Sequence, residues 1–462
     1  MHVKYYPVEF NLDQLIREEL PYVAGFYSEA VQAGIKSEFQ LNQDVKDHFG
    51  FFTQNQSAMP FYHIKNSSCH EIGVTFEKTY DMLIDALHYL FYQETEDVLK
   101  KYFNCAFLRK HPYFIDYAKY TFSNRENTSS AQAIYGRFDA VLDPQTEKVV
   151  GIYEFNGDTP TMLFESVNLQ NWLTRKVFGS SYPQYNNFWD IAEKTLDNMG
   201  DLPEGSFAAV VFDSSYVEDM ATAETIAQLF HEELDYCLYA DGNEIDYRHD
   251  VYGESPFFIN DYRVDVMYVL KPWEEMVEGF PYAFENWRTW AKYVTIMEPA
   301  WRWFLSHKGI WAYVTDLAER NHSFRDKWAG LPILFTQLTP DFFIKNNMKY
   351  VAKPVIGRMS SNIKIYDGKG NIEFESQGPY ENVECVYQEY CPPGQVVGRN
   401  NFIIGMWMAP SAVIVDGYRA DAATLCIREF ESPVLGFFNE RFCPHVVKTE
   451  TESFLLPSSI RD

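Results

Sequence analysis

Apolar positions recur at helical spacing through the first part of the chain. Residues 71–103, which include FEKTYDMLIDALHYLFYQETEDVLKKYF, carry an apolar side chain every three or four positions. Residues 10–34 repeat this spacing. The pattern predicts a mainly helical region over residues 1–120.

Short β-rich runs appear beyond that region, at QAIYGRFDAVL, VVGIYEF and FAAVVFDSS. Helical stretches separate them. In the first stretch, PTMLFESVNLQNWLTRKVF, Thr159 is a candidate N-cap and Pro160 falls in the first turn. In the second, which follows FDSSYVEDMA, Thr222 is a candidate cap. This alternation of strands and helices predicts α/β layers.

The last third of the chain contains further strands. The segment KYVAKPVIGRMSSNIKIYD reads as strand, loop and strand, and VECVYQEY, NFIIGMWM, SAVIVDGYRA and ATLCIREF predict an antiparallel sheet. We therefore expect an α/β (α+β) protein in three parts. These are a helical region over residues 1–120, an α/β part over 121–300 and a third part over 301–462.

Oxygen-bearing side chains gather on the hairpin that YGRFDAVLD and GIYEFNGDTPT predict. Side chains alternate along a strand, so Arg137 and Asp139 share one face of the first strand, and Glu154 and Asn156 share one face of the second. Carboxylate and amide oxygens suit magnesium, which bridges carboxylates to nucleotide phosphates. The alternative is a surface hairpin with solvated polar ends.

Lys353 ends an apolar strand just before the small, polar loop IGRMSSN. Backbone N–H groups of such a loop can fold over phosphates, so the segment is a candidate nucleotide lid. By itself a Lys-Pro pair after a strand also fits an ordinary exposed hairpin.

Two further charged groups follow predicted strands. Glu218 and Asp219 come after a strand, where paired carboxylates attract an amine or merely complement a helix dipole. Arg428, in LCIREFESP, carries a planar fork of donors that suits a phosphate or carboxylate, or a surface salt bridge.

Charge and composition narrow the class of protein. The formal net charge is −26, which disfavours binding to nucleic acid or to an anionic membrane and favours a small cationic partner. Aromatic residues make up 17% of the chain, as expected for large packed cores and wide clefts. No secretory leader and no apolar run long enough to span a membrane is seen, so we expect a cytoplasmic protein.

Several kinds of chemistry have no sequence signature here. The 7 cysteines form no C-x-x-C pair, so neither a disulfide framework nor a zinc site is predicted. No G-x-S-x-G, H-E-x-x-H, Walker A or G-x-G-x-x-G motif occurs either. Nothing in the sequence therefore indicates hydrolysis by a nucleophile.

Taken in order, the motifs resemble the synthetase domain of the glutathionylspermidine synthase family, which are ATP-grasp carbon–nitrogen ligases. The matching segments span about residues 137–445 and follow one another in the family's order. They are GRFDAV, YEFNGDTPTMLFES, FDSSYVEDMAT, VMYVLKPWEEM, MEPAWRWFLSHKG, YVAKPVIGRMSSNI, VYQEY, IREFESP and NERFCPH.

The resemblance implies an ATP-grasp fold with antiparallel sheets around a nucleotide cleft, and an acyl phosphate made from a peptide carboxylate, ATP and Mg²⁺ before attack by an amine such as spermidine. It implies these roles: Asp139, Glu154 and Asn156 for magnesium; Lys308, Lys353, Gly357, Ser360, Ser361 and Gln388 for ATP; Arg137 and Arg428 for the acyl substrate and its phosphorylated form; Thr159 and Thr161 for that pocket; Glu218 and Asp219 for the amine.

Two positions depart from the family pattern. The lid reads GRMSSN, with Met359 and Ser360 where the family has a glycine, so we expect a less flexible lid. Phe437 stands where the family has a lysine. These departures favour a changed acyl substrate. They also leave two alternatives: a ligase for another peptide and amine, or a non-catalytic relative that binds ATP or polyamine. The sequence gives no general base and no oligomeric state.

Overall fold

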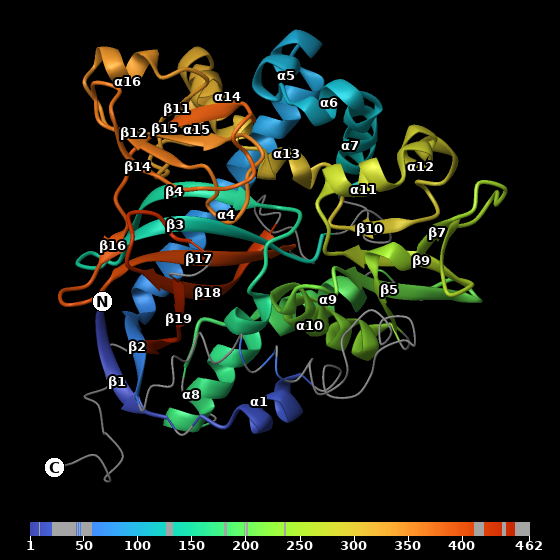
Figure 1. The fold of residues 1–462 in the computed structure, drawn as a ribbon, viewed down its shortest axis with the longest axis horizontal. Coiled ribbons are helices and arrows are strands. Elements are labelled where there is room, and N and C mark those ends of the chain that lie inside the picture. The colour runs from blue at the N-terminus through green and yellow to red at the C-terminus, as the bar shows by residue number, and fades with distance from the viewer. Residues whose placement is uncertain are drawn as a thin grey trace.

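The computed structural model describes residues 1–8, 10–20, 43, 45, 47, 58–125, 133–179, 183–197, 199, 202–234, 237–410, 420–436 and 440–448 (Figure 1). Helices and mostly antiparallel sheets build the fold, which confirms the mixed class predicted from the sequence. The α-helices in this part of the chain are α1 (Leu12–Glu19), α4 (Asn66–Tyr92), α5 (Glu96–Tyr102), α6 (Ala106–Lys110), α7 (Tyr113–Ser123), α8 (Gln170–Phe178), α9 (Phe188–Asp197), α10 (Val217–Glu233), α11 (Trp273–Gly279), α12 (Pro281–Glu285), α13 (Arg302–Ser306), α14 (Gly309–Arg320), α15 (His322–Lys327) and α16 (Asp341–Lys345).

A six-stranded antiparallel sheet occupies the middle of the molecule, with α4 packed against it (Figure 1). Aromatic rings form part of this contact, because Phe76 and Tyr80 of α4 lie against Phe138 and Phe155 of the sheet. The strand order is β19 (Glu440–Cys443), β18 (Ala420–Phe430), β17 (Asn401–Pro410), β3 (Gly136–Asp143) and β4 (Lys148–Asn156), and β16 (Gly394–Gln395) also pairs with β17.

Three other sheets surround this one. A five-stranded antiparallel sheet holds the predicted lid loop between two of its strands, β12 and β13. A mixed sheet has parallel pairing where β5 meets β6 and β9, and in a three-stranded sheet β2 lies between β1 and β20. The lid-loop sheet has the order β11 (Thr336–Gln337), β15 (Cys385–Glu389), β12 (Tyr350–Pro354), β13 (Lys364–Tyr366) and β14 (Ile372–Glu375). The mixed sheet has the order β6 (Cys237–Asp241), β5 (Ser206–Phe212), β9 (Tyr262–Val269), β8 (Phe257–Ile259) and β7 (Ile245–Tyr247), and β10 (Thr295–Met297) also pairs with β9. The three-stranded sheet has the order β1 (His2–Pro7), β2 (Ala58–Lys65) and β20 (His445–Lys448).

The local pattern identified most of these elements correctly. The hairpin β3–β4, the strand-loop-strand β12–β13 and the antiparallel pair β17–β18 are all present. The helical region contains two unpredicted strands, β1 and β2. Strand β2 is buried along almost its whole length, so its sequence lacks the alternation that reveals a strand. Most of the segments 10–34 and SAVIVDGYRA lies outside the described residues.

Both helix starts predicted from capping residues are wrong. Met162 has φ +71°, a left-handed value that an α-helix does not contain, so the helical segment begins after it and Thr159 caps nothing. Helix α10 begins at Val217, which places Thr222 inside the helix and puts Glu218 and Asp219 in its first turn.

A glycine allows one close contact that supports the site. Gly309 is the first residue of α14, immediately after Lys308, and a Cβ added there would lie 1.9 Å from the carbonyl oxygen of Tyr102. Because a backbone oxygen cannot rotate away, Gly309→Ala is expected to destabilise the fold by about 1–3 kcal/mol or more. The measurement is the thermal unfolding midpoint. The control is Gly279→Ala, because the added Cβ meets nothing within 4 Å at that position; equal midpoints for both variants would contradict the contact.

Candidate functional site

A cavity of about 850 Å³ opens between the central sheet, the lid sheet and the ends of the strands of the mixed sheet. Twelve of the predicted site residues line it: Ser360 of the lid loop and eleven others. The eleven are Arg137, Asp139, Glu154, Asn156, Thr159, Thr161, Glu218, Asp219, Lys353, Gln388 and Arg428. Lys308, Gly357 and Ser361 are not among the residues that line it. Phe437 is outside the described residues.

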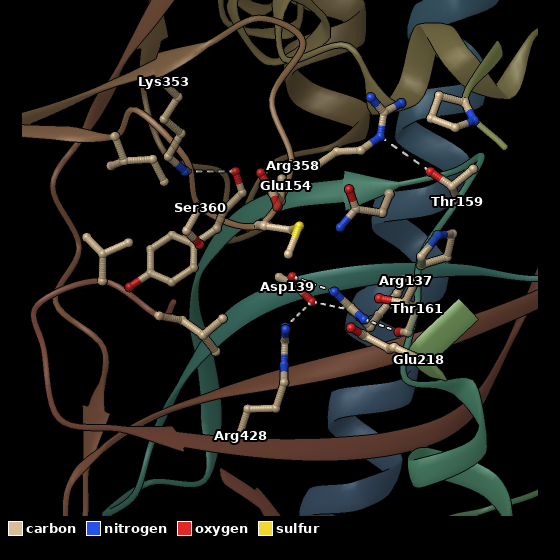
Figure 2. A pocket seen from close by; sticks show the side chains of 18 of the residues that line it. Arg137, Asp139, Glu154, Thr159, Thr161, Glu218, Lys353, Arg358, Ser360 and Arg428 are labelled. Carbon is tan, nitrogen blue, oxygen red and sulfur yellow. Dashed lines mark hydrogen bonds and ion pairs between the residues drawn. The ribbon is translucent and has the colours of Figure 1, made fainter. Parts of the chain in front are cut away.

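The β3–β4 hairpin forms the floor. Asp139 of β3 pairs directly with Glu154 of β4, so the two carboxylates sit on adjacent strands at one level. Asp139 is enclosed by two arginines: Arg137 Nε and Nη2 donate to its two oxygens at 2.7 and 3.1 Å, and Arg428 Nη2 lies 2.7 Å from Oδ1. Figure 2 shows the carboxylate between the two guanidinium groups. Burial alone would raise the pKa of Asp139, but the arginines outweigh it and lower the pKa to about 2.

Two buried lysines lie beside Glu154. Lys308 Nζ is 3.2 Å from Glu154 Oε2 and donates to the carbonyl oxygen of Gly357 at 2.9 Å. Lys353 Nζ donates to Gln388 Oε1 at 2.6 Å and to the carbonyl oxygen of Tyr153 at 3.3 Å. Burial lowers the pKa of Lys353 to about 8, against the opposing effect of Glu154. Burial opposes the ionised form of Glu154, yet its pKa is lowered because both lysines outweigh that effect.

The lid loop between β12 and β13 is tied down by an arginine that the sequence analysis did not single out. Arg358 Nη1 donates to Glu274 at 2.6 Å and Nη2 to Asp158 at 3.3 Å, while Nε donates to Thr159 at 3.4 Å. Its partners come from α11 and from the turn after β4. The loop therefore bridges two other parts of the cavity wall (Figure 2).

The departures from the family's lid pattern coincide with an unusual backbone. Met359 and Ser360 have φ values of +55° and +51°, in the left-handed region that favours glycine. The Met359 side chain is 61% exposed at the cavity mouth. Non-glycine residues thus occupy two successive positions where glycine would be less strained.

One end of the cavity is acidic. Burial, together with the negative charges of Glu218, Asp213 and Glu275, raises the pKa of Asp219 to about 8. Burial likewise raises the pKa of Glu275. These side chains lie at the carboxyl ends of the strands and at the start of α10 and α11, with Lys271 among them. Asp213, Glu275 and Lys271 were missed because each follows a strand or opens a helix, where charge is common in any protein.

The opposite end of the cavity is apolar and lies between the lid sheet and the central sheet. It begins next to Lys353 and Gln388, on β12 and β15. The apolar residues are Val351, Ile363, Ile365, Ile403, Val434 and Leu435.

The donor set suits magnesium held together with a phosphorylated ligand. In the described part of the chain no three His, Cys, Asp or Glu side chains group as a metal cluster, and the floor offers two carboxylates and Asn156. Magnesium usually takes only one or two protein carboxylates, the other ligands being phosphate oxygens and water. Asp139, Glu154 and Asn156 therefore fit Mg²⁺ carrying a nucleotide better than an all-protein metal centre.

The chain belongs to the glutathionylspermidine synthase preATP-grasp family, whose model matches residues 33–448. The resemblance seen in the sequence is thereby confirmed. The chain is 25% identical over 309 residues, which are 62% of this chain and 70% of the relative, to a Haemophilus influenzae protein named "putative acid–amine ligase". It is 29% identical over 132 residues, 29% of this chain and 19% of the relative, to the trypanothione synthetase of Crithidia fasciculata.

Among solved structures, a glutathione synthetase-like effector from Globodera pallida matches with a TM-score of 0.48 and 10% identity, over 92% of this chain and 100% of that chain. Family membership and the curated relatives indicate a ligase of the glutathionylspermidine synthase type.

Two further findings concern the cysteines and the helices. All seven cysteines are unpaired in the structure. Within the described ranges, no helix has both the length and the apolar character needed to cross a bilayer.

Proposed function

We propose that the chain is an ATP-dependent ligase that joins a short peptide carboxylate, glutathione-like in size and charge, to a polyamine such as spermidine. The observation that carries this proposal is the order of charges along one cavity. Lys353 stands beside an apolar end, two carboxylates and two arginines occupy the middle, and acidic side chains fill the far end. An anionic nucleotide and an acid need positive groups, whereas a cationic amine needs negative groups, and this cavity offers both kinds.

The middle of the cavity supplies what acid activation needs. A carboxylate becomes an acyl donor once a phosphoryl group makes its oxygen a good leaving group. Arg137 and Arg428 would orient the acid, and Lys353 and Lys308 would offset charge on the transferring phosphoryl group. Bound Mg²⁺, held by Asp139, Glu154 and Asn156, would supply further charge neutralisation there.

The acidic end would receive the amine. Its carboxylates favour a protonated amine, and Asp219 and Glu218 lie at the start of α10 on the cavity wall. A nitrogen at the near end of a polyamine must lose its proton before it attacks the acyl phosphate, whereas the distal nitrogens stay charged and hold the molecule in place. Thr159 and Thr161 line the wall between the two regions.

The amine site gives a pH-dependent prediction. Because the pKa of Asp219 is raised to about 8 by burial and by its acidic neighbours, its carboxyl group is largely neutral at pH 7 and ionised at pH 9. The terminal ammonium groups of spermidine, with pKa values near that of lysine (about 10.4), stay largely charged in this window. The KM for spermidine is therefore expected to fall from pH 7 to pH 9.

Steady-state kinetics across this range, at saturating ATP and acid, measure that fall. In Asp219→Asn the change of KM with pH should become smaller. In the double variant that carries both Glu218→Gln and Asp219→Asn, the KM at pH 9 should rise by roughly tenfold to a hundredfold, because charge-assisted contacts are lost. An unchanged KM in the double variant would show that the acidic end does not bind the amine.

The acyl substrate is tested separately. We infer that it differs from glutathione, since Met359 and Ser360 alter the lid beside its pocket and Phe437 replaces a lysine of the family pattern. ADP release is measured with spermidine and either glutathione or a panel of other short peptides and carboxylates. Fastest turnover with another acid is the expected result. Glutathione as the best donor, at about 1 per second or faster, would contradict the changed specificity.

A further inference from the structure

The ion pairs on Asp139 place one carboxylate where two arginines converge. Arg137 gives it Nε and Nη2, and Arg428 gives it Nη2. Arg428 comes from β18 and Asp139 from β3, and both strands flank β17. Three guanidinium nitrogens thus lie within 3.1 Å of one carboxylate, which is the arrangement that a bound acid would need.

Each arginine is also held from another side. Arg137 Nη1 donates to the carbonyl oxygen of Thr161 at 2.6 Å, and its guanidinium lies 5.5 Å from the ring centre of Trp407. Arg428 Nη1 lies 3.9 Å from the buried carboxylate of Glu440. These contacts do not involve Asp139, so both side chains have anchors that remain if Asp139 turns away.

The backbone makes room for the arrangement. Gly405 of β17 is the register partner of Asp139, and a Cβ there would lie 3.0 Å from Arg137 Cδ and 2.5 Å from Cys426 Sγ. The side chain of Arg137 therefore crosses β17 where Gly405, which has no side chain, leaves room for it. Glu154, the cross-strand partner of Asp139, pairs with Lys308 instead and forms no ion pair with either arginine in the described part of the chain.

We propose that Asp139 is an internal stand-in for the acid substrate, and that a divalent cation binding to Asp139 releases Arg137 and Arg428 to bind that acid. Arg137, Arg428 and the divalent cation compete for the carboxylate of Asp139. Binding of the cation therefore increases the accessibility of both arginines. Coupling of this kind is reciprocal: the acid also strengthens cation binding. The inference rests on the proposed function for its ligand, and on the contacts of Asp139 for its mechanism.

Residue-resolved labelling of arginine with phenylglyoxal, read by peptide mass spectrometry, tests the release without any substrate. In Asp139→Asn, labelling of Arg137 and Arg428 is expected to be about tenfold faster than in the unmodified chain, within the 5- to 150-fold span of typical coupling. Glu154→Gln is the matched control, since it alters the neighbouring carboxylate of the same floor but removes no partner of either arginine. Its labelling should match the unmodified chain at both positions.

A second arm uses the unmodified chain, because loss of a buried ion-pair partner can unfold a variant. Saturating Mg²⁺ with ADP is expected to speed labelling at Arg137 and Arg428. Two results would overturn the inference. One is that Asp139→Asn keeps its thermal midpoint but is labelled as slowly as the unmodified chain. The other is that adding Mg²⁺ with ADP leaves labelling of the unmodified chain unchanged or makes it slower. Failure of the ligase proposal would appear elsewhere, as ADP release that ignores every acid and amine, and would leave the Asp139→Asn labelling result unaffected.

Discussion

Lys353→Met is expected to weaken ATP binding at least tenfold and to lower the turnover rate by about 10² to 10³, the loss typical for removal of one preorganised electrostatic donor. Methionine keeps the length of the side chain but not its charge. Lys353 is buried at the junction between the apolar end and the carboxylate floor, bonded to Gln388 and to the Tyr153 carbonyl. Calorimetric titration with ATP and steady-state kinetics measure the two effects.

Lys349→Met is the matched control. Lys349 directly precedes β12, but its side chain is exposed and pairs with Glu373 at 2.5 Å, away from the cavity lining. The lowered pKa of Lys353, about 8, adds a pH signature: the nucleotide affinity of the free protein should fall as pH rises through 8, because the ammonium loses its proton. Lys353→Arg should remove that fall, since arginine keeps its charge. Wild-type affinity in Lys353→Met would refute the nucleotide role.

Glu154→Ala is expected to abolish ATP turnover, with a loss of 10³-fold or more estimated from the charge stabilisation that a bound Mg²⁺ supplies. Glu154 faces the cavity from the floor, directly across from Asp139, and its lowered pKa keeps it ionised, although burial opposes this. Asn156→Ala should produce a loss in the same direction. Turnover is measured over a magnesium titration that reaches saturation.

Asp143→Asn serves as the control for charge on the same hairpin. Asp143 ends β3 at the far turn, where it accepts hydrogen bonds from Gln145 and Thr146, and it does not line the cavity. Its turnover should stay close to that of the unmodified chain. Full activity of Glu154→Ala at saturating Mg²⁺ would rule out the metal assignment.

The sequence predicted the parts of the site that depend on local pattern. Alternation along β3 and β4 placed Asp139 and Glu154 on the hairpin correctly, because the side-chain period of a strand is fixed by its backbone. The strand-loop-strand around Lys353 was equally local. The roles of these residues remain proposals, although the structure brings the side chains to one cavity.

Contacts between distant segments were not predictable in the same way. The lid residue Arg358 was overlooked because its partners, Asp158 and Glu274, lie on two other segments. The enclosure of Asp139 by Arg428 depends on both β3 and β18 pairing with β17. The predictions of helix starts were wrong for a different reason. Residues that can cap a helix occur at many positions, and near Thr159 the left-handed φ of Met162 determines where the helical segment begins.

The central claim is that this cavity joins an acid to an amine at the expense of ATP. The most direct test incubates the purified chain with ATP, Mg²⁺, spermidine and a panel of short peptide acids, and follows ADP release together with product mass. The account predicts ADP release only when an acid and the amine are both present, and a product whose mass is their sum less one water. ADP release independent of either partner, or no conjugate with any acid in the panel, would contradict it.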